Sequence, residues 1–461
     1  MPDQPAHVSA QAEFVARHLR LHAQPVTDPA ARRLAILALD TYAIASHARA
    51  TGTGATRADA ALAGPGDVPV WGGGQSDLQG AAFLNGCAAE ALDFQEVLID
   101  GRNNGHAAVV IVPALLALAA ERGLAGGQVL AALRTGFVAN VALARALGRG
   151  HRRGEAGFRT TAMAAPVAGA LACALAAGAD EAQANHATAI AAATLPAGLL
   201  AAMSPLSGDF SVDKDLSVGF SARHAVECGL LAMAGATGPA DVLAGPRGWL
   251  ASYGFGDTDT GALRADPSAT VLEQYALKLY PANFGCQCAI RLALEVAETT
   301  PLHDIAEVEV RVKESSAASL STRRITSHVA ARFSLAYAVA SAMVRGRSVL
   351  GDYEGESLSD PDVLSFTDRI TVIGDARLEA RHQSEGIFPA RLTITRSDGG
   401  IRHAALDMPQ DGMGRVALDA AFARKIHSLC PEAVANRLLH LLDTGAYQAL
   451  TTALTTGKET R

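Results

Sequence analysis

Long segments built from Ala, Gly and aliphatic residues constrain the fold of this chain more than any other feature. Two examples are AAVVIVPALLALAA, which starts at Ala107, and TTAMAAPVAGALACALAAGA, which starts at Thr160. Aromatic residues make up only 5% of the chain. Ala is the best helix former, whereas sheets favour aromatic and β-branched residues. The sequence therefore predicts closely packed helices and not a β-sandwich.

Neither segment predicts a membrane span. The first has 14 residues and contains Pro113, and the second is mostly Ala, Gly and Thr, which supply little transfer free energy. A net charge of −7 gives no electrostatic reason to expect nucleic acid as a partner. The first residues lack the pattern of a signal peptide, and the six cysteines are scattered as in a reduced protein. We expect a cytoplasmic protein that binds neither membrane nor nucleic acid.

The periodicity of apolar residues changes along the chain. From residue 11 to about 238 it follows the helical spacing of 3.6, and it becomes helical again after Met408. Between these regions, IAEVEVRVKES and DRITVIG alternate as strands do, and RLTITRSDGGIRHAAL predicts two strands around an Asp398-Gly399 turn. We predict a mainly α fold with a smaller α+β domain. Residues 1–268 and 405–461 would form the helical domain, and residues 269–404 a lid-like α+β domain inserted in it.

Ionisable residues at three junctions between loop and helix are candidates for chemistry. His106 precedes an apolar helix, where the helix dipole disfavours imidazolium and leaves a neutral ring able to act as a base. Lys214 lies between two aspartates at another helix start, and Lys278 precedes Pro281 and a helical run. Taken singly, each also fits an ordinary loop or surface position. Signatures of zincins, serine hydrolases, P-loops and dinucleotide-binding folds are absent, and no set of metal ligands is expected.

Six motifs, in order along the chain, resemble the MmgE/PrpD family, which includes 2-methylcitrate dehydratase, cis-aconitate decarboxylase and iminodisuccinate epimerase. The motifs are AEALDF, NGHAAVVIVPALLALAAERG, GFRTTAMAAPVAGALACAL, VDKDLSVGFSARHAV, LKLYPANFG and ARFSLAYAVASAMVRG. The likeness extends from about residue 10 to 445. It implies a large helical domain built from both chain ends with a smaller α+β domain, and an active site in the cleft between them. It also implies a homodimer that works without metal or organic cofactor.

The resemblance also implies site residues. Asp93, His106, Lys214 and Lys278 match polar active-site positions of the family and are the predicted catalytic residues. The family acts by proton transfer at a carbon next to a carboxylate. His106 would be the general base or acid, Asp93 would orient it or supply a second proton group, and the lysines would stabilise negative charge developing on the substrate.

Two positions depart from the family pattern. ALDFQEV replaces the common ALDFDDT, so a Thr hydroxyl becomes Val97, and GFR replaces GFH, so a histidine becomes Arg159. Guanidinium is a poor proton shuttle but binds carboxylates with a bidentate fork. We therefore predict that Arg159 binds substrate carboxylate. Tyr280, two residues after Lys278, and His151, ahead of Arg159, are further candidates for substrate binding.

The favoured function is that of a cofactor-independent lyase, a dehydratase or decarboxylase, acting on a small di- or tricarboxylic acid. Three cations around one site favour a polycarboxylate over a monoacid. An epimerase or isomerase of a dicarboxylate is the first alternative, which needs two proton-transferring groups on opposite faces of the substrate. A catalytically altered homologue that only binds an acid or a partner protein is the second, and Val97 and Arg159 are the reasons for considering it.

Overall fold

Helices dominate the chain, and the Ala-rich segments form the longest of them. The computed structural model describes residues 9–57, 59–100, 105–148, 157–199, 210–256, 258–408 and 415–456. The predicted mainly α fold with a smaller α+β part is confirmed. The helices of the first part are α1 (Ala10–His22), α2 (Asp28–Thr51), α3 (Leu78–Glu90), α4 (Ala108–Arg122), α5 (Gly126–Ala146), α7 (Thr161–Ala176), α8 (Glu181–Ala193), α9 (Asp213–Met233), α10 (Trp249–Tyr253) and α11 (Gly261–Arg264).

Short strands and 3-10 turns connect these helices. The strands form two small antiparallel pairs, β1 (Val68–Pro69) with β2 (Gln75–Ser76) and β3 (Val97–Leu98) with β4 (Tyr275–Ala276). Among the residues that the structure describes, the 3-10 turns are η1 (Gly54–Arg57), η2 (Asp59–Leu62), η4 (Ala269–Gln274), η5 (Phe284–Cys286), η6 (Leu302–Asp304), η7 (Leu350–Tyr353) and η8 (Gly355–Ser359). The β3–β4 pair joins the segment after α3 to the segment that carries Lys278, two segments far apart in sequence.

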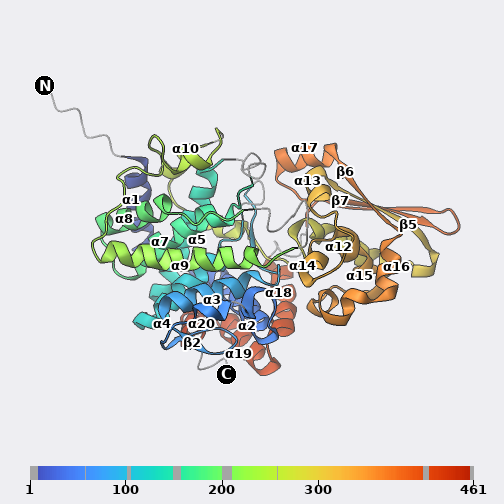
Figure 1. Cartoon of the computed structure of the whole chain (residues 1–461), viewed down its shortest axis with the longest axis horizontal. Helices are drawn as coiled ribbons and strands as arrows, with labels where there is room; N and C mark the ends of the chain where they lie inside the picture. Colours follow the sequence, from blue (N-terminus) through green and yellow to red (C-terminus); the bar gives the residue numbers. More distant parts are fainter. Residues whose placement is uncertain are drawn as a thin grey trace.

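The last three helices return to the first part of the chain. They are α18 (Arg415–Leu429), α19 (Glu432–Asp443) and α20 (Tyr447–Thr456). Apolar residues of all three join the hydrophobic cluster of α1–α9, and Figure 1 shows these red helices beside the blue ones. The helical part is thus built from both ends of the chain, although the exact domain boundaries at residues 268 and 404 stay a prediction.

A second hydrophobic cluster lies in the α+β part, where the predicted strands are confirmed. The sheet runs β6 (Ile370–Asp375), β5 (Ile305–Lys313), β7 (Ala390–Arg396) and β8 (Ile401–Leu406), with only β5 and β6 parallel. On β5, Val308, Val310 and Val312 are buried, as the alternation predicted. The helices of this part are α12 (Gln287–Ala297), α13 (Glu314–Ser319), α14 (His328–Arg332), α15 (Leu335–Arg345), α16 (Pro361–Thr367) and α17 (Ala376–Glu385).

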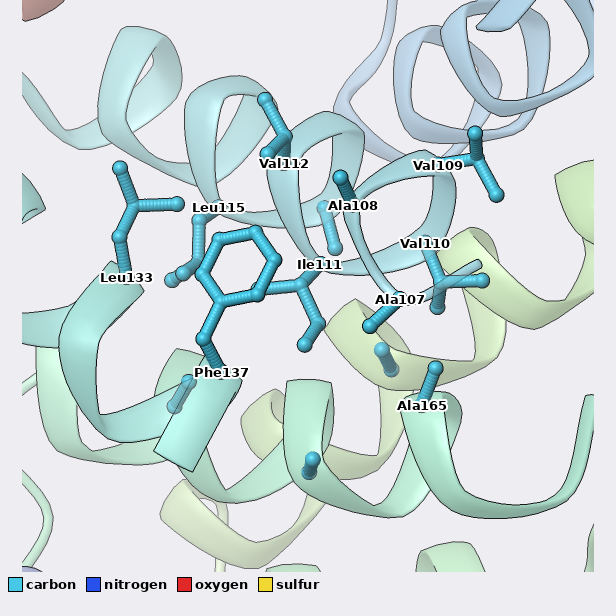
Figure 2. Close-up of a cluster of buried hydrophobic side chains, with 14 of the residues drawn as sticks. Ala107, Ala108, Val109, Val110, Ile111, Val112, Leu115, Leu133, Phe137 and Ala165 are labelled. Atoms are coloured by element: carbon cyan, nitrogen blue, oxygen red, sulfur yellow. The ribbon is translucent and has the colours of Figure 1, made fainter. Parts of the chain in front are cut away.

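The apolar segment after His106 forms the centre of the helical part. Figure 2 shows the start of α4 facing α5 and α7. Ile111 of α4 lies next to Phe137 of α5, and Ala165 lies on α7. Pro113 lies within the first turns of α4. This packing fixes the start of α4 and, with it, the loop that ends at His106.

One described helix, α5, is long and apolar enough to cross a membrane, and 83% of its most apolar window is buried inside the protein. Such burial is typical of the core helix of a soluble protein.

Candidate active site

Small residues bring helices α3 and α9 together and set the frame of the site. A Cβ added at Gly219 of α9 would lie 2.4 Å from Cys87 Sγ and 2.8 Å from the Phe83 carbonyl oxygen of α3. Only glycine permits this approach, because real Cβ contacts are longer. The helices run so that the end of α3, at Glu90, lies beside the start of α9, at Lys214. The site is therefore built on two rigid helix ends.

Glu90 collects two cations at the end of α3. Its Oε1 lies 2.6 Å from Arg159 Nη2 and 3.1 Å from Lys214 Nζ, and its Oε2 accepts a hydrogen bond from Gln95 Nε2 at 2.8 Å. Arg159 Nη1 also donates to the Lys214 carbonyl oxygen and to Ser217 Oγ, each at 2.8 Å. The side chain of Glu90 is 0% exposed and that of Arg159 is 3% exposed. Buried charged groups need several hydrogen bonds and ion pairs of this kind, because their removal from water is otherwise costly.

Asp93 bridges the two lysines. Its Oδ1 lies 3.0 Å from Lys278 Nζ and 3.4 Å from Lys214 Nζ, and Lys278 Nζ also donates to the Asp93 carbonyl oxygen at 2.9 Å. Asp93 has a φ of 49°, the left-handed conformation that costs free energy in any residue other than glycine. The contacts of both the carboxylate and the backbone carbonyl with the lysines offset part of this cost.

His106 is held in place by contacts with Thr161 and with the backbone of Glu96. Gly105, with a φ of 92°, lets the chain approach Thr161, whose Oγ1 accepts a hydrogen bond from the His106 amide at 3.0 Å. The imidazole Nδ1 lies 2.5 Å from the Glu96 carbonyl oxygen. A carbonyl only accepts, so Nδ1 carries the proton and the lone pair of the neutral ring is on Nε2. His106 is half-buried as a residue.

Burial and ion pairing together set the charge of the groups around the lysines. Burial raises the pKa of Asp93, but Lys278 and Lys214 outweigh it and bring the value down to about 2. The pKa of Glu90 is likewise raised by burial and then lowered below its ordinary value by Lys214 and Arg159. Burial lowers the pKa of Lys214, whereas the carboxylates of Glu90 and Asp93 raise it overall. The inner carboxylates are therefore ionised and Lys214 is cationic at neutral pH.

Groups at the edge of this cluster are held neutral or close to it. Burial, followed by the charge of Lys278, lowers the pKa of His106 to about 4. Burial raises the pKa of Glu96 to about 8 and that of Asp215 to about 7. Burial lowers the pKa of Lys278 below its ordinary value. The site thus combines a neutral imidazole with a lysine that loses its proton more readily than a free one.

A second buried ion pair supports the loop between Asp93 and Glu96. Lys425 of α18 lies with its Nζ 2.7 Å from Asp40 Oδ1 of α2, and it donates to the Phe94 carbonyl oxygen at 2.7 Å. Its ammonium also lies 4.1 Å from the centre of the Phe94 ring. The C-terminal segment therefore fixes the backbone that presents Asp93 and, through the Glu96 carbonyl, His106.

The structure brings the four residues predicted as catalytic into one cluster. Asp93, Lys214 and Lys278 are in direct contact, and the charges of Lys278 and Asp93 both act on the His106 imidazole. Their catalytic roles stay predictions.

The predicted substrate-binding residues have different surroundings. Arg159 belongs to the same cluster, but its carboxylate partner is the protein's own Glu90. Tyr280 is half-buried, and its amide donates to Gln287 Oε1. His151 lies outside the described residues. Val97 is fully buried in β3, opposite Ala276, as a hydrophobic residue in place of the family's Thr.

Sequence reasoning missed Glu90, Glu96 and the Asp40–Lys425 pair. Each is a charged residue within or directly beside an otherwise apolar segment, a pattern that could have drawn attention to them. Their partners, however, are up to 385 residues away in sequence. Over the described ranges, no group of three or more His, Cys, Asp and Glu residues is placed to hold a metal ion.

Two protein-family models match the chain. The MmgE/PrpD N-terminal domain matches residues 11–260, and the MmgE/PrpD C-terminal domain matches residues 280–439. No curated protein matches the sequence significantly. The two matches, in this order, cover most of the chain.

Proposed function

Because the chain belongs to the MmgE/PrpD family, we propose that it is a lyase, a dehydratase or decarboxylase, that acts on a small di- or tricarboxylic acid without a cofactor. Members of this family are generally enzymes with dehydratase or other lyase activity. The observation that carries the proposal is the neutral imidazole of His106, anchored through Nδ1, beside the charges of Lys278 and Asp93.

Proton abstraction is the first step of the proposed dehydration. A C–H bond next to a substrate carboxylate breaks, its proton goes to His106 Nε2, and its electron pair delocalises into that carboxylate. Lys214 and Lys278 stabilise the charge that develops there. A bound carboxylate also adds negative charge beside the imidazole, which raises the pKa of His106 from about 4 and strengthens it as a base.

The two lyases differ in which bonds break. In dehydration the electron pair forms a C=C bond while the C–O bond of the neighbouring carbon breaks. Lys278, whose pKa burial lowers, donates the proton that lets the hydroxide leave as water. Decarboxylation omits the abstraction: the C–C bond to a carboxylate breaks, CO2 leaves, and the electron pair left on carbon takes a proton from His106, whose ring solvent has protonated before this step.

Lys278 also supports the alternative of an epimerase. A lysine with a lowered pKa can transfer a proton, and it would supply the second group on the other face of the substrate. In this reaction the proton removed by one group is replaced by a proton from the other, with no bond to oxygen or carbon broken.

Proton NMR in deuterated water tests the proposal. The wild-type protein is incubated with a panel of di- and tricarboxylic acids, alongside His106→Gln and the control His303→Gln, whose side chain is 84% exposed. Loss of water or CO2 with wild type and His303→Gln but not with His106→Gln is the expected result. Exchange without net conversion would replace the lyase by the epimerase. No exchange with any acid would overturn both and leave a binding protein.

A further inference from the structure

Arg332 is a buried cation whose donors are only partly used. The side chain is 1% exposed, and Nη2 lies 2.6 Å from Glu354 Oε1. Its Nε and Nη1 atoms are shielded from solvent, and no described residue accepts a hydrogen bond from them. Buried guanidinium donors without acceptors are costly, and a bound ligand that accepts hydrogen bonds from them would offset that cost.

His328 lies one helical turn before Arg332 on α14. Its Nε2 is also shielded from solvent and has no hydrogen-bond partner among the residues described. Apart from burial, the charges of Arg332 and Lys214 are what lowers its pKa. The imidazole therefore lies within the field of both cations.

Helix α14 reaches the candidate active site from the α+β part. The ring of Phe333, which follows Arg332, has its centre 5.9 Å from Lys214 Nζ. The Arg332 carbonyl oxygen accepts a hydrogen bond from the Asn283 amide at 3.0 Å, which ties α14 to the segment after Lys278. In Figure 1, α14 lies where the two parts of the molecule meet, near one end of α9.

Charge balance shows why the site needs further donors. Arg159, Lys214 and Lys278 carry three positive charges, and Glu90 and Asp93 return two negative ones. Asp215, whose pKa is about 7, is partly ionised at neutral pH and acts on Lys214, so the excess is at most one positive charge and matches no more than a single substrate carboxylate. A substrate with two or three carboxylates requires additional cationic or hydrogen-bonding groups.

We propose that Arg332 and His328 form a second carboxylate subsite, which binds the carboxylate farther from the reacting carbon. The inference rests on the proposed function, because it assigns the distal part of the same substrate. Arg332 Nε or Nη1 and His328 Nε2–H donate to the carboxylate oxygens, and Phe333 packs against the carbon chain between the subsites. The ligand class is a dicarboxylate or tricarboxylate, and the subsite selects it over a monocarboxylate of the same length.

Calorimetric titration with matched, unreactive acids tests the subsite. Glutarate and pentanoate have the same five-carbon chain and differ by one carboxylate, and tricarballylate adds a third. For the wild-type protein we expect glutarate or tricarballylate to bind about 10- to 100-fold more tightly than pentanoate, the factor typical of charge-assisted hydrogen bonds.

The variants separate this subsite from the rest of the site. His328→Gln and the charge-balanced double variant Arg332→Gln/Glu354→Gln should lower the preference for the extra carboxylate about tenfold or more, with pentanoate affinity nearly unchanged. The control Arg311→Gln, at a partly exposed position on β5, should keep the preference. Circular dichroism verifies that each variant is folded.

Two outcomes overturn the inference in distinguishable ways. If folded His328→Gln and the double variant keep the wild-type preference, while Lys214→Gln loses affinity for every acid, the subsite is wrong and the proposed function stands. If the wild-type protein binds none of the acids, the proposed function fails and the subsite fails with it.

Discussion

Replacing Arg159 by Met tests whether this residue holds the site together or binds substrate. The matched control is Arg145→Met, because both arginines lie 2.6 Å from a carboxylate oxygen. The pairs differ in burial: Arg159 and Glu90 are 3% and 0% exposed, whereas Arg145 and Asp100 are 39% and 17% exposed. Arg159 also donates to the Lys214 carbonyl oxygen and to Ser217 Oγ, so a difference in effect reports burial together with these contacts and not the ion-pair distance.

The structure gives the expected magnitudes. Breaking a buried ion pair by removing one partner costs about 3–5 kcal/mol. Glu90 keeps Lys214 at 3.1 Å, so we expect the lower end, about 3 kcal/mol, for Arg159→Met. The exposed pair of Arg145 should contribute less than about 1 kcal/mol. The double variant Glu90→Gln/Arg159→Met has no buried carboxylate at position 90. Its loss of stability should therefore be about 2 kcal/mol smaller than the sum of the losses of the two single variants.

Urea denaturation followed by circular dichroism measures these stabilities, and steady-state kinetics on the substrate found by NMR measures KM. A positioning role predicts a large loss of stability with positive coupling to Glu90. If Arg159→Met is no less stable than Arg145→Met and instead raises KM, Arg159 binds substrate directly and the positioning argument is refuted.

Three further changes address the neighbouring groups. His106→Asn should lower kcat at least 100-fold. Because the pKa of His106 is about 4, kcat/KM of the wild-type protein should not fall on the acid side of a pKa near 6.5. A fall near pH 6.5 would contradict the lowered pKa of His106. Glu96 has a folded-state pKa raised to about 8, so its stabilising contribution is present below pH 4.5 and is lost as pH rises through 8. Between pH 5 and pH 9 this loss lowers the free energy of unfolding of the wild-type protein by about 4 kcal/mol. In Glu96→Gln, the urea midpoints measured at pH 5, 7 and 9 should therefore depend less on pH, and an unchanged pH dependence would disprove the raised pKa. Lys425→Met should lower the free energy of unfolding by about 3–5 kcal/mol, because Asp40 stays buried without its lysine. The double variant with Asp40→Asn should recover most of this loss in the same urea titration. If the single and double variants lose the same stability, the pairing is contradicted.

Elements whose cause is local could be predicted from the sequence. The alternation in IAEVEVRVKES predicted β5, because side chains of a strand point to opposite faces. The Asp398-Gly399 turn predicted the β7–β8 hairpin. His106 was a candidate because a helix start favours a neutral imidazole, and the resemblance to the family made it a predicted catalytic residue. The structure adds a different cause, burial, as the larger influence on its pKa.

Contacts whose cause is tertiary could not be predicted. Glu90 follows an apolar helix, and nothing in AAEALDF shows that its partners are Arg159 and Lys214. Lys425 lies in LDAAFARKIHSLC, where it fits an exposed helix face, yet it is buried against Asp40. Partner choice depends on which helix ends meet, and that is set by close packing at positions such as Gly219.

The inner carboxylates change what the three cations can do. Arg159, Lys214 and Lys278 buried without partners would repel one another and be costly to remove from water. Glu90 and Asp93 offset that cost before substrate binds, and they hold the lysine ammonium groups in place. The same pairing, with the partly ionised Asp215, leaves at most one positive charge in excess. The cluster therefore suits the developing charge on one carboxylate, and selection for a second carboxylate must come from groups outside it, as α14 provides.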